Sequence, residues 1–146
     1  QGPQRSQSIM GAMMMFTYDP KLKKTLPFYD RFPLCIPVQK AKGGFHGLNL
    51  HYLHPNVRAQ FLDSLYDLKT NDKWDISTKM RLTYSLLKGS SGLRYFKPCF
   101  KHYLTQHIQG QFLLVEPADW EIAIFLPTES FRKVGKETVW STVQVA

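Results

Sequence analysis

Two strand-like runs joined by a pair of glycines, together residues 34–53, constrain the fold of this chain more than any other feature of its sequence. In both runs apolar side chains alternate with other residues, which places every second side chain on the same face of a strand. The pair Gly43 and Gly44 fits a hairpin turn, where positive φ angles are needed. Pro33 and Pro37 predict that the first strand is irregular or lies at a sheet edge, because proline donates no ladder hydrogen bond. The sequence therefore predicts an antiparallel β-hairpin.

Three helices are predicted after the hairpin, over residues 55–68, 77–88 and 98–109. Pro55 and Pro98 open the first and the third, at a position where the missing N–H costs nothing. All three segments carry apolar residues at helical spacing. Residues 111–116 form a short apolar run that predicts a further strand. These elements indicate an α+β fold class, in which a small antiparallel sheet packs with about three helices.

The ends of the chain carry patterns of their own. Residues 120–126 fit a strand by their alternation and a helix by the proline that precedes them, so both structures remain open. Alternating valines near the C-terminus predict an extended arm that pairs with another strand. The chain thus divides into an N-terminal arm (1–15), one globular domain (16–137) and a C-terminal arm (138–146). It opens without an initiator methionine or a secretory pattern, which indicates processing or truncation.

Charge is distributed unevenly along this chain of formal net charge +8. Residues 76–115 contain no acidic residue, and this one-signed, aromatic-rich stretch favours a polyanionic partner such as nucleic acid. The candidate nucleic-acid-binding residues are its basic side chains, Lys79, Arg81, Lys88, Arg94, Lys97 and Lys101. Such a patch would bind phosphates without reading sequence. An acidic protein surface would satisfy the same patch, and the aromatics fit core packing as well as base stacking.

The sequence carries no motif for catalysis or for a cofactor. Its histidines lie at spacings that place them on opposite faces of a strand or miss the i,i+4 geometry of zinc-binding helices, so no metal site is predicted. Asp63 and Asp67 lie one helical turn apart beside Arg58, an arrangement that a solvated helix face explains. Cys35 and Cys99 are expected to be buried thiols. No apolar run is long enough to span a bilayer, so no membrane partner is predicted.

Several motifs resemble those of a virion protein family of contractile-tailed bacteriophages, whose members are often labelled DNA end protector proteins. The most extended are LPFYDRFPL (residues 26–34), GGFHGLNLHYL (43–53), RYFKPC (94–99) and WEIAIFLP (120–127), with shorter ones at 18–21, 58–59, 131–133 and 139–140. The resemblance covers most of the chain after residue 13. It implies a virion component, assembled in the host cytoplasm, that binds the end of the packaged genome or closes the head or neck. It supplies no catalytic residues.

Two functional hypotheses therefore stand. In the first, the basic patch caps an end of double-stranded DNA. In the second, the protein is a structural adaptor that contacts other virion proteins of the portal, neck, tail or baseplate, assembles as a ring-shaped homo-oligomer and does not bind DNA. The candidate interface residues are Met13, Met14, Met15, Val143 and Val145. Methionine suits irregular core gaps as well as adaptable interfaces, so the N-terminal methionine cluster is expected in the core or against a neighbouring chain.

Overall fold

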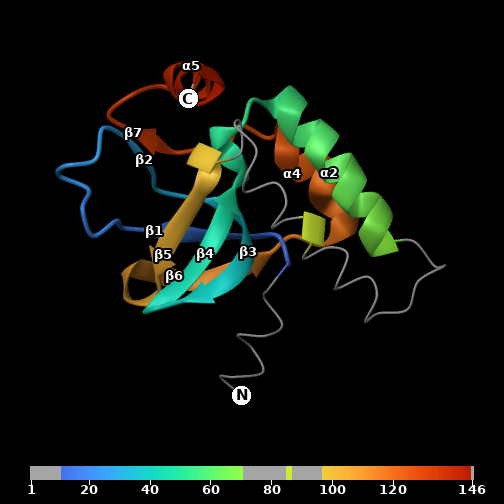
Figure 1. Ribbon diagram of the computed structural model, residues 1–146, viewed down its shortest axis with the longest axis horizontal. Coiled ribbons are helices and arrows are strands. Elements are labelled where there is room, and N and C mark those ends of the chain that lie inside the picture. Colours follow the sequence, from blue (N-terminus) through green and yellow to red (C-terminus); the bar gives the residue numbers. More distant parts are fainter. Residues whose placement is uncertain (1–10, 71–84, 87–96, 146) are drawn as a thin grey trace.

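The computed structural model describes residues 11–70, 85–86 and 97–145 of the chain. These residues form a five-stranded antiparallel sheet, a two-stranded sheet and three α-helices, which confirms the predicted α+β class (Figure 1). The strands are β1 (Met14–Tyr18), β2 (Tyr29–Asp30), β3 (Leu34–Ala41), β4 (Gly44–Asn49), β5 (Phe100–Leu104), β6 (Ile108–Leu114) and β7 (Phe131–Arg132). The α-helices are α2 (Pro55–Thr70), α4 (Trp120–Phe125) and α5 (Lys136–Val145), and the 3₁₀ helices are η1 (Leu50–Tyr52), η2 (Lys97–Cys99), η3 (Thr105–His107) and η4 (Pro117–Asp119).

The large sheet has the strand order β5-β4-β3-β1-β6 and curls on itself. Its two edge strands, β5 and β6, are joined by the three residues of η3, a connection that is possible only if the two edges approach one another. Leu104 of β5 donates its backbone N–H to the hydroxyl of Tyr18 over 2.8 Å, which ties the edge strand β5 to β1, the neighbour of the other edge strand β6. The curl thus creates an enclosed inner face and a convex outer face.

The predicted hairpin is confirmed as β3 and β4, with Ala41 paired to Gly44 across the turn. Gly43 has a φ of 78°, a conformation that favours glycine. The register shifts between Pro37 and Gln39, as the proline in this strand predicts. The second strand ends earlier than predicted, because the side chain of Asn49 accepts a hydrogen bond from the backbone N–H of His51 and starts η1.

An inner core of aromatic residues fills the curled sheet. Its buried members are Met14, Phe16, Tyr18, Cys35, Phe45 and Tyr103. Phe16 and Tyr103 meet edge to face, with ring centroids 5.3 Å apart and planes at 89°, a geometry that aromatic pairs prefer. Residues of four strands meet in this cluster, so it stabilises the curl of the sheet.

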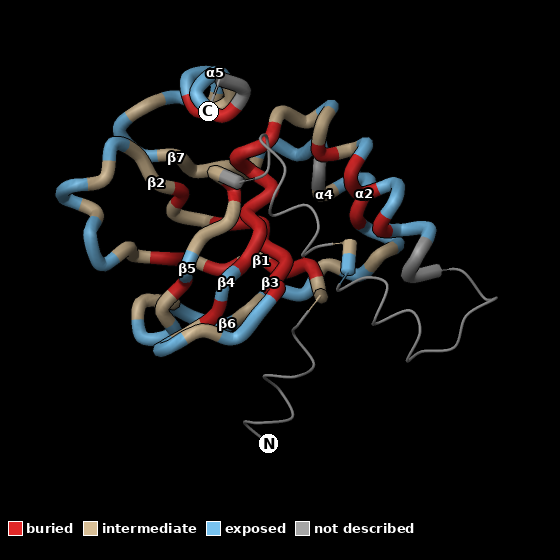
Figure 2. The backbone as a smooth tube through the Cα atoms, viewed as in Figure 1, coloured by how far each residue is buried: buried red, intermediate tan, exposed pale blue. Residues whose placement is uncertain are grey.

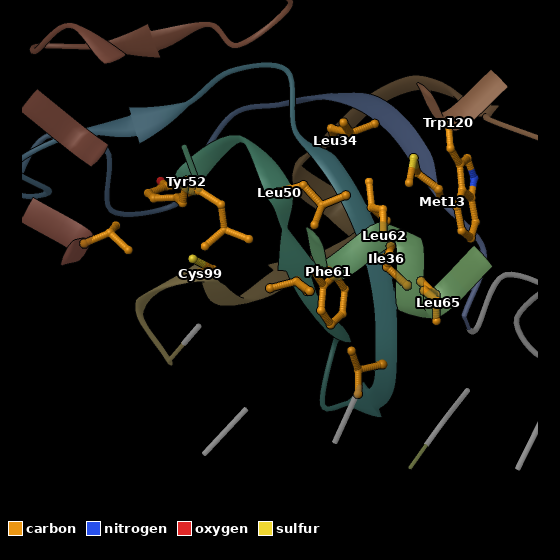
Figure 3. Packing of buried hydrophobic residues seen from close by; sticks show 14 of the residues in the cluster. Met13, Leu34, Ile36, Leu50, Tyr52, Phe61, Leu62, Leu65, Cys99 and Trp120 are labelled. Atoms are coloured by element: carbon orange, nitrogen blue, oxygen red, sulfur yellow. The ribbon is translucent and has the colours of Figure 1, made fainter. Parts of the chain in front are cut away.

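A second, outer core lies between the sheet and the helices. Leu34 and Ile36 of β3 pack with Leu62 and Leu65 of α2, and Met13 lies beside Trp120 of α4 (Figure 3). Val139 and Val143 of α5 belong to the same cluster. The buried residues therefore concentrate on the central strands and on the inward sides of the helices (Figure 2).

The predicted helix over 98–109 is wrong, because this segment forms the end of η2, then β5, η3 and the start of β6. Its apolar spacing fits a helix, but its aromatic residues also have high strand propensity. β5 pairs with β4 from Phe100 opposite Leu48 to Leu104 opposite Gly44. Pairing with β4, which would otherwise be a sheet edge, decides in favour of the strand. The strand predicted over 111–116 lies largely within β6, which begins earlier.

The other predicted helices and the C-terminal arm have different outcomes in the structure. The helix predicted over 55–68 is confirmed as α2. Residues 120–126, for which both helix and strand were open, contain the helix α4. The helix predicted over 77–88 lies outside the described residues apart from 85–86. The extended pairing predicted near the C-terminus is wrong, because these residues form α5. Val139 and Val143, spaced by one helical turn, both reach the outer core, so the alternation in the sequence is secondary to the i,i+4 spacing.

The close approach of β3 to β4 at Gly47 allows the packing of the sheet to be tested by substitution. A Cβ atom at Gly47 would lie 2.3 Å from Sγ of the buried Cys35. We expect Gly47→Ala to lower the free energy of unfolding by about 1–3 kcal/mol, as overpacking of a core does. Urea unfolding monitored by circular dichroism measures this loss. Gly135→Ala is the matched control, since a Cβ there meets only Oε2 of Glu137, at 3.8 Å. Equal stability of the two variants would contradict the packing described here.

Candidate nucleic-acid interface

The predicted basic patch is only partly covered by the described residues. Lys79, Arg81, Lys88 and Arg94 lie outside them, and for Lys97 the backbone alone is described, in η2. Lys101 is described in full and lies on the edge strand β5. The predicted joining of these six side chains in one patch therefore stays a prediction.

Lys101 is a half-buried cation whose Nζ lies 4.3 Å from the centroid of the Tyr52 ring, within the range of a cation–π interaction. Among the described residues, none of the ion pairs includes Lys101. Burial lowers the pKa of its amine below the ordinary value, because the charged form loses solvation. An anion bound here would therefore stabilise the charged form of Lys101, which none of the ion pairs among the described residues does.

Further lysines gather near β5 from two turns that are distant in sequence. Lys40 and Lys42 lie at the β3–β4 turn, and Lys21, Lys23 and Lys24 lie in the turn after β1. Both turns are attached to η3. The N–H of Thr105 donates to the carbonyl of Gly43 over 2.9 Å, and the N–H of Asp19 donates to the carbonyl of His107 over 3.1 Å. We call these five lysines, together with His46, His102 and His107, the basic face. Lys101 precedes His102 on β5, and its side chain points to the other side of the strand, toward Tyr52.

Histidines connect the parts of the basic face. The ring of His102 bonds through Nε2 to the carbonyl of Lys42 at 2.9 Å, and its centroid lies 5.0 Å from that of His46 on β4. The sequence patterns do not predict that these two lysine-bearing turns meet. The missing information was the curl of the sheet, which no local pattern encodes.

Acidic side chains of the described residues lie mostly elsewhere. Asp63 and Asp67 are on α2, and Glu116, Asp119 and Glu121 are in or beside η4 and α4. In Figure 1 these helices lie on the right, whereas the turn after β1 and the β3–β4 turn lie on the left and lower left. Asp19 is the acidic residue nearest in sequence to the lysines of the first turn, and it forms an ion pair with Lys23 at 2.9 Å. Among the described residues, the lysines of the two turns therefore lie apart from the acidic side chains of α2 and α4.

Lys133 fixes the shape of the turn after β1. Its Nζ donates to the carbonyls of Lys23 at 2.7 Å, Lys24 at 3.4 Å and Leu26. Lys133 itself has a φ of 81°, uncommon for a residue with a side chain. Its ammonium is engaged by three carbonyl groups, so it orders the lysines of the turn while being less available to a ligand.

An open cavity of about 340 Å³ lies between this turn and β5. Tyr18, Phe28, Tyr29 and Tyr52 form much of its wall, and Lys21 and Lys101 also line it. We call this cavity the aromatic pocket. Its volume falls within the range of about 300–1,000 Å³ that is typical of small-molecule sites.

The buried carboxylate of Asp30 lies at the wall of the aromatic pocket and holds several segments together. Oδ1 accepts hydrogen bonds from the N–H groups of Phe32 and Ser130, each 3.1 Å long. Oδ2 accepts from Nδ2 of Asn49 at 3.1 Å and from Nδ1 of His51 at 2.7 Å. Burial alone would raise the pKa of Asp30, but these hydrogen bonds and the His51 ring together hold it below its ordinary value.

The order Asp30–His51–Thr128 resembles the relay of a hydrolase, since Nε2 of His51 lies 3.0 Å from Oγ1 of Thr128. However, the His51 side chain has no exposed surface. Its backbone carbonyl also accepts a 2.9 Å bond from Nε1 of Trp140. A substrate cannot reach this imidazole, so we assign it a structural role.

Comparison with protein-family models supplies the decisive observation. Residues 1–145 match the model of a family described as Phage T4 terminal DNA protecting protein. The chain belongs to this family. The match confirms the resemblance to DNA end protectors that the motifs indicate. Neither the curated proteins nor the solved structures contain a match to the chain.

Arg58, in the family-like motif at 58–59, has a structural role in this chain. Arg58, expected on the solvated face of α2 beside Asp63, is instead 1% exposed. Its Nε donates to the carbonyl of Leu53 at 3.1 Å, and it forms an ion pair with Glu129 at 3.5 Å. Its guanidinium also lies 5.9 Å from the centroid of Trp140. The expectation for Arg58 was wrong because its partners lie 71 and 82 residues further along the chain.

The candidate interface residues lie largely in the cores. Met13 and Val143 belong to the outer core, Met14 to the inner core, and Met15 packs against the outer core. For Val145 only the backbone, at the end of α5, is described. Of the two alternatives for the methionine cluster, the structure shows the core. Cys35 and Cys99 are both buried thiols, as predicted.

The described residues contain no group of three or more His, Cys, Asp and Glu side chains placed to hold a metal ion. Within the same part of the chain, no helix has the length and hydropathy needed to cross a membrane.

The Asp30 network predicts a stability that depends on pH. Asp30→Asn leaves His51 and three other donors without the charge they surround, and we expect a loss of about 3–5 kcal/mol in the free energy of unfolding, as for other broken buried pairs. Because the folded-state pKa is depressed, this carboxylate stabilises the fold above the unfolded-state pKa of about 3.9 and ceases to do so as pH falls through the lower folded value.

Thermal unfolding of both forms between pH 7 and pH 3 measures this contribution. The stability difference between wild type and Asp30→Asn should be largest at neutral pH and shrink in acid. Glu121→Gln, on an exposed helix position, is the control and should show no comparable loss. A difference that stayed constant down to pH 3 would contradict the assignment.

Proposed function

We propose that the protein binds the end of double-stranded DNA in a phage particle through its basic face, without reading base sequence. The observation that carries the proposal is the convergence of five turn lysines beside Lys101 in a chain of the terminal DNA protecting family. Phosphates supply most of the affinity in sequence-independent binding. A genome end needs such binding if it is to be covered whatever its sequence.

The arrangement of the basic face suits a phosphate backbone. Lys21, Lys24, Lys40 and Lys42 are exposed, and lysine acts as a flexible point charge that adapts to different phosphate positions. The two turns approach from either side of η3. Duplex DNA carries one charge for about every 1.7 Å of its axis, so several phosphates would fall within reach of a surface of this kind.

The proposal includes the basic residues of the acid-free window. Lys79, Arg81, Lys88, Arg94 and Lys97 would add their positive charge to that of the basic face in attracting phosphates. Alanine substitution of these residues, followed by DNA binding over a salt series, measures their contribution.

A second candidate function is the structural adaptor, and a separate surface feature favours it. Apolar side chains are unusually exposed on β6 and on or after α4, namely Leu113, Leu114, Ile122, Phe125 and Leu126, with exposed fractions between 48% and 61%. Exposed apolar side chains of this size suit contacts with other proteins. They could contact portal, neck or tail proteins or further copies in a ring, and thereby close the head. This role is compatible with DNA binding, but alone it requires none.

Binding of a blunt linear duplex over a salt series tests the proposal. We expect measurable affinity that falls steeply with salt, because bound phosphates release counterions. The double variant Lys40→Ala/Lys42→Ala should reduce the slope of log K against log salt by about 0.9 for each lost phosphate contact. Fluorescence anisotropy of end-labelled DNA measures both quantities.

The matched control is Asp63→Asn/Glu121→Gln, which alters two charges on α2 and α4. It should leave the salt slope unchanged. Weak binding with no salt dependence is the result expected of a pure adaptor and would overturn the proposal.

A further inference from the structure

The aromatic pocket combines features that the proposed phosphate contacts do not use. It opens beside the basic face, since Lys21 and His102 belong to both. Its wall is mainly aromatic and apolar, with Phe28 and Tyr52 6.1 Å apart between ring centroids. Leu22, 60% exposed, also lines it. A pocket of this composition is larger and more apolar than phosphate binding alone requires.

The polar groups of the aromatic pocket differ in how far they are already engaged. Both oxygens of Asp30 accept two hydrogen bonds each within the protein. Lys101 forms no ion pair among the described residues, and its ammonium faces the Tyr52 ring. The pocket therefore offers the cation of Lys101 above an aromatic wall, with the exposed Lys21 at its lining as well, which fits a ligand that carries both a flat ring and an anionic group.

We propose that the aromatic pocket receives the terminal nucleotide of a DNA strand, with its base on the aromatic wall and its phosphate at Lys101. The inference rests on the proposed function, because the basic face would bring the duplex to the pocket. A terminal base has a stacking neighbour on one side only, so it leaves the stack more readily than an internal base. Aromatic side chains accept any base, since every base has a π-face. The pocket would thus distinguish an end from the interior of a duplex without reading sequence.

Two DNA molecules of equal length test this inference, one a blunt open duplex and the other a dumbbell closed at both ends by hairpin loops. The full chain should bind the open duplex more tightly than the dumbbell, by at least about fivefold, the lower end of the range that stacking of one base on an aromatic side chain provides. Lys101→Met, which keeps the apolar stem, and Leu22→Trp, which fills the mouth, should each bring this ratio close to one. Dumbbell affinity should stay near the wild-type value with Leu22→Trp.

Leu113→Trp is the matched control, since Leu113 is as exposed as Leu22 but lies on β6. It should keep the wild-type ratio, and Lys40→Ala/Lys42→Ala should weaken binding to both DNAs while leaving the ratio intact. If wild type binds both DNAs equally, or if Leu22→Trp keeps the end preference, the pocket inference is overturned and DNA binding by the basic face stands. If wild type binds neither DNA, the proposed function itself fails.

Discussion

Most of the described structure depends on the hydrogen bonds that the buried carboxylate of Asp30 accepts. A buried charge is costly unless hydrogen bonds replace its hydration. Four donors from three regions of the chain do so here. Through Asn49, which also donates to the hydroxyl of Tyr103 at 3.1 Å, the network reaches the inner core. Through Ser130 and His51 it reaches the segment that precedes α5. The sheet, the turn after β1 and the C-terminal helix are thereby held in one arrangement.

This arrangement positions the proposed DNA-binding surface. The curl of the sheet brings η3 between two lysine-bearing turns, and Lys133 holds one of them through its carbonyl groups. Asp30 forms part of the pocket wall while its charge is engaged within the protein. The lysines of the basic face are largely exposed, whereas residues of the pocket wall such as Tyr18, Tyr52 and Tyr103 belong to the cores. A pocket built on the cores beside exposed long side chains suits the proposed recognition of an end without its sequence.

Local patterns in the sequence were sufficient for the hairpin β3–β4 and for α2, because alternation and helical spacing are properties of a few neighbouring residues. β5 was mistaken for a helix, since its apolar residues fit both periods and only the pairing with β4 decides. Buried polar pairs such as Arg58 with Glu129 could not be predicted, because the partners are far apart in sequence and each alone resembles a surface residue. The basic face was missed for the same reason. Its lysines were visible, but their convergence requires the curl of the sheet.

Digestion of a linear duplex by a double-strand exonuclease, beside digestion of the same DNA by a nonspecific endonuclease, tests end binding without any variant. An end-binding protein should slow the exonuclease at concentrations that leave internal cleavage unchanged, and raised salt should abolish this protection. Equal protection of ends and interior would show coating of DNA by charge alone. No protection of either would contradict DNA binding and leave the adaptor role.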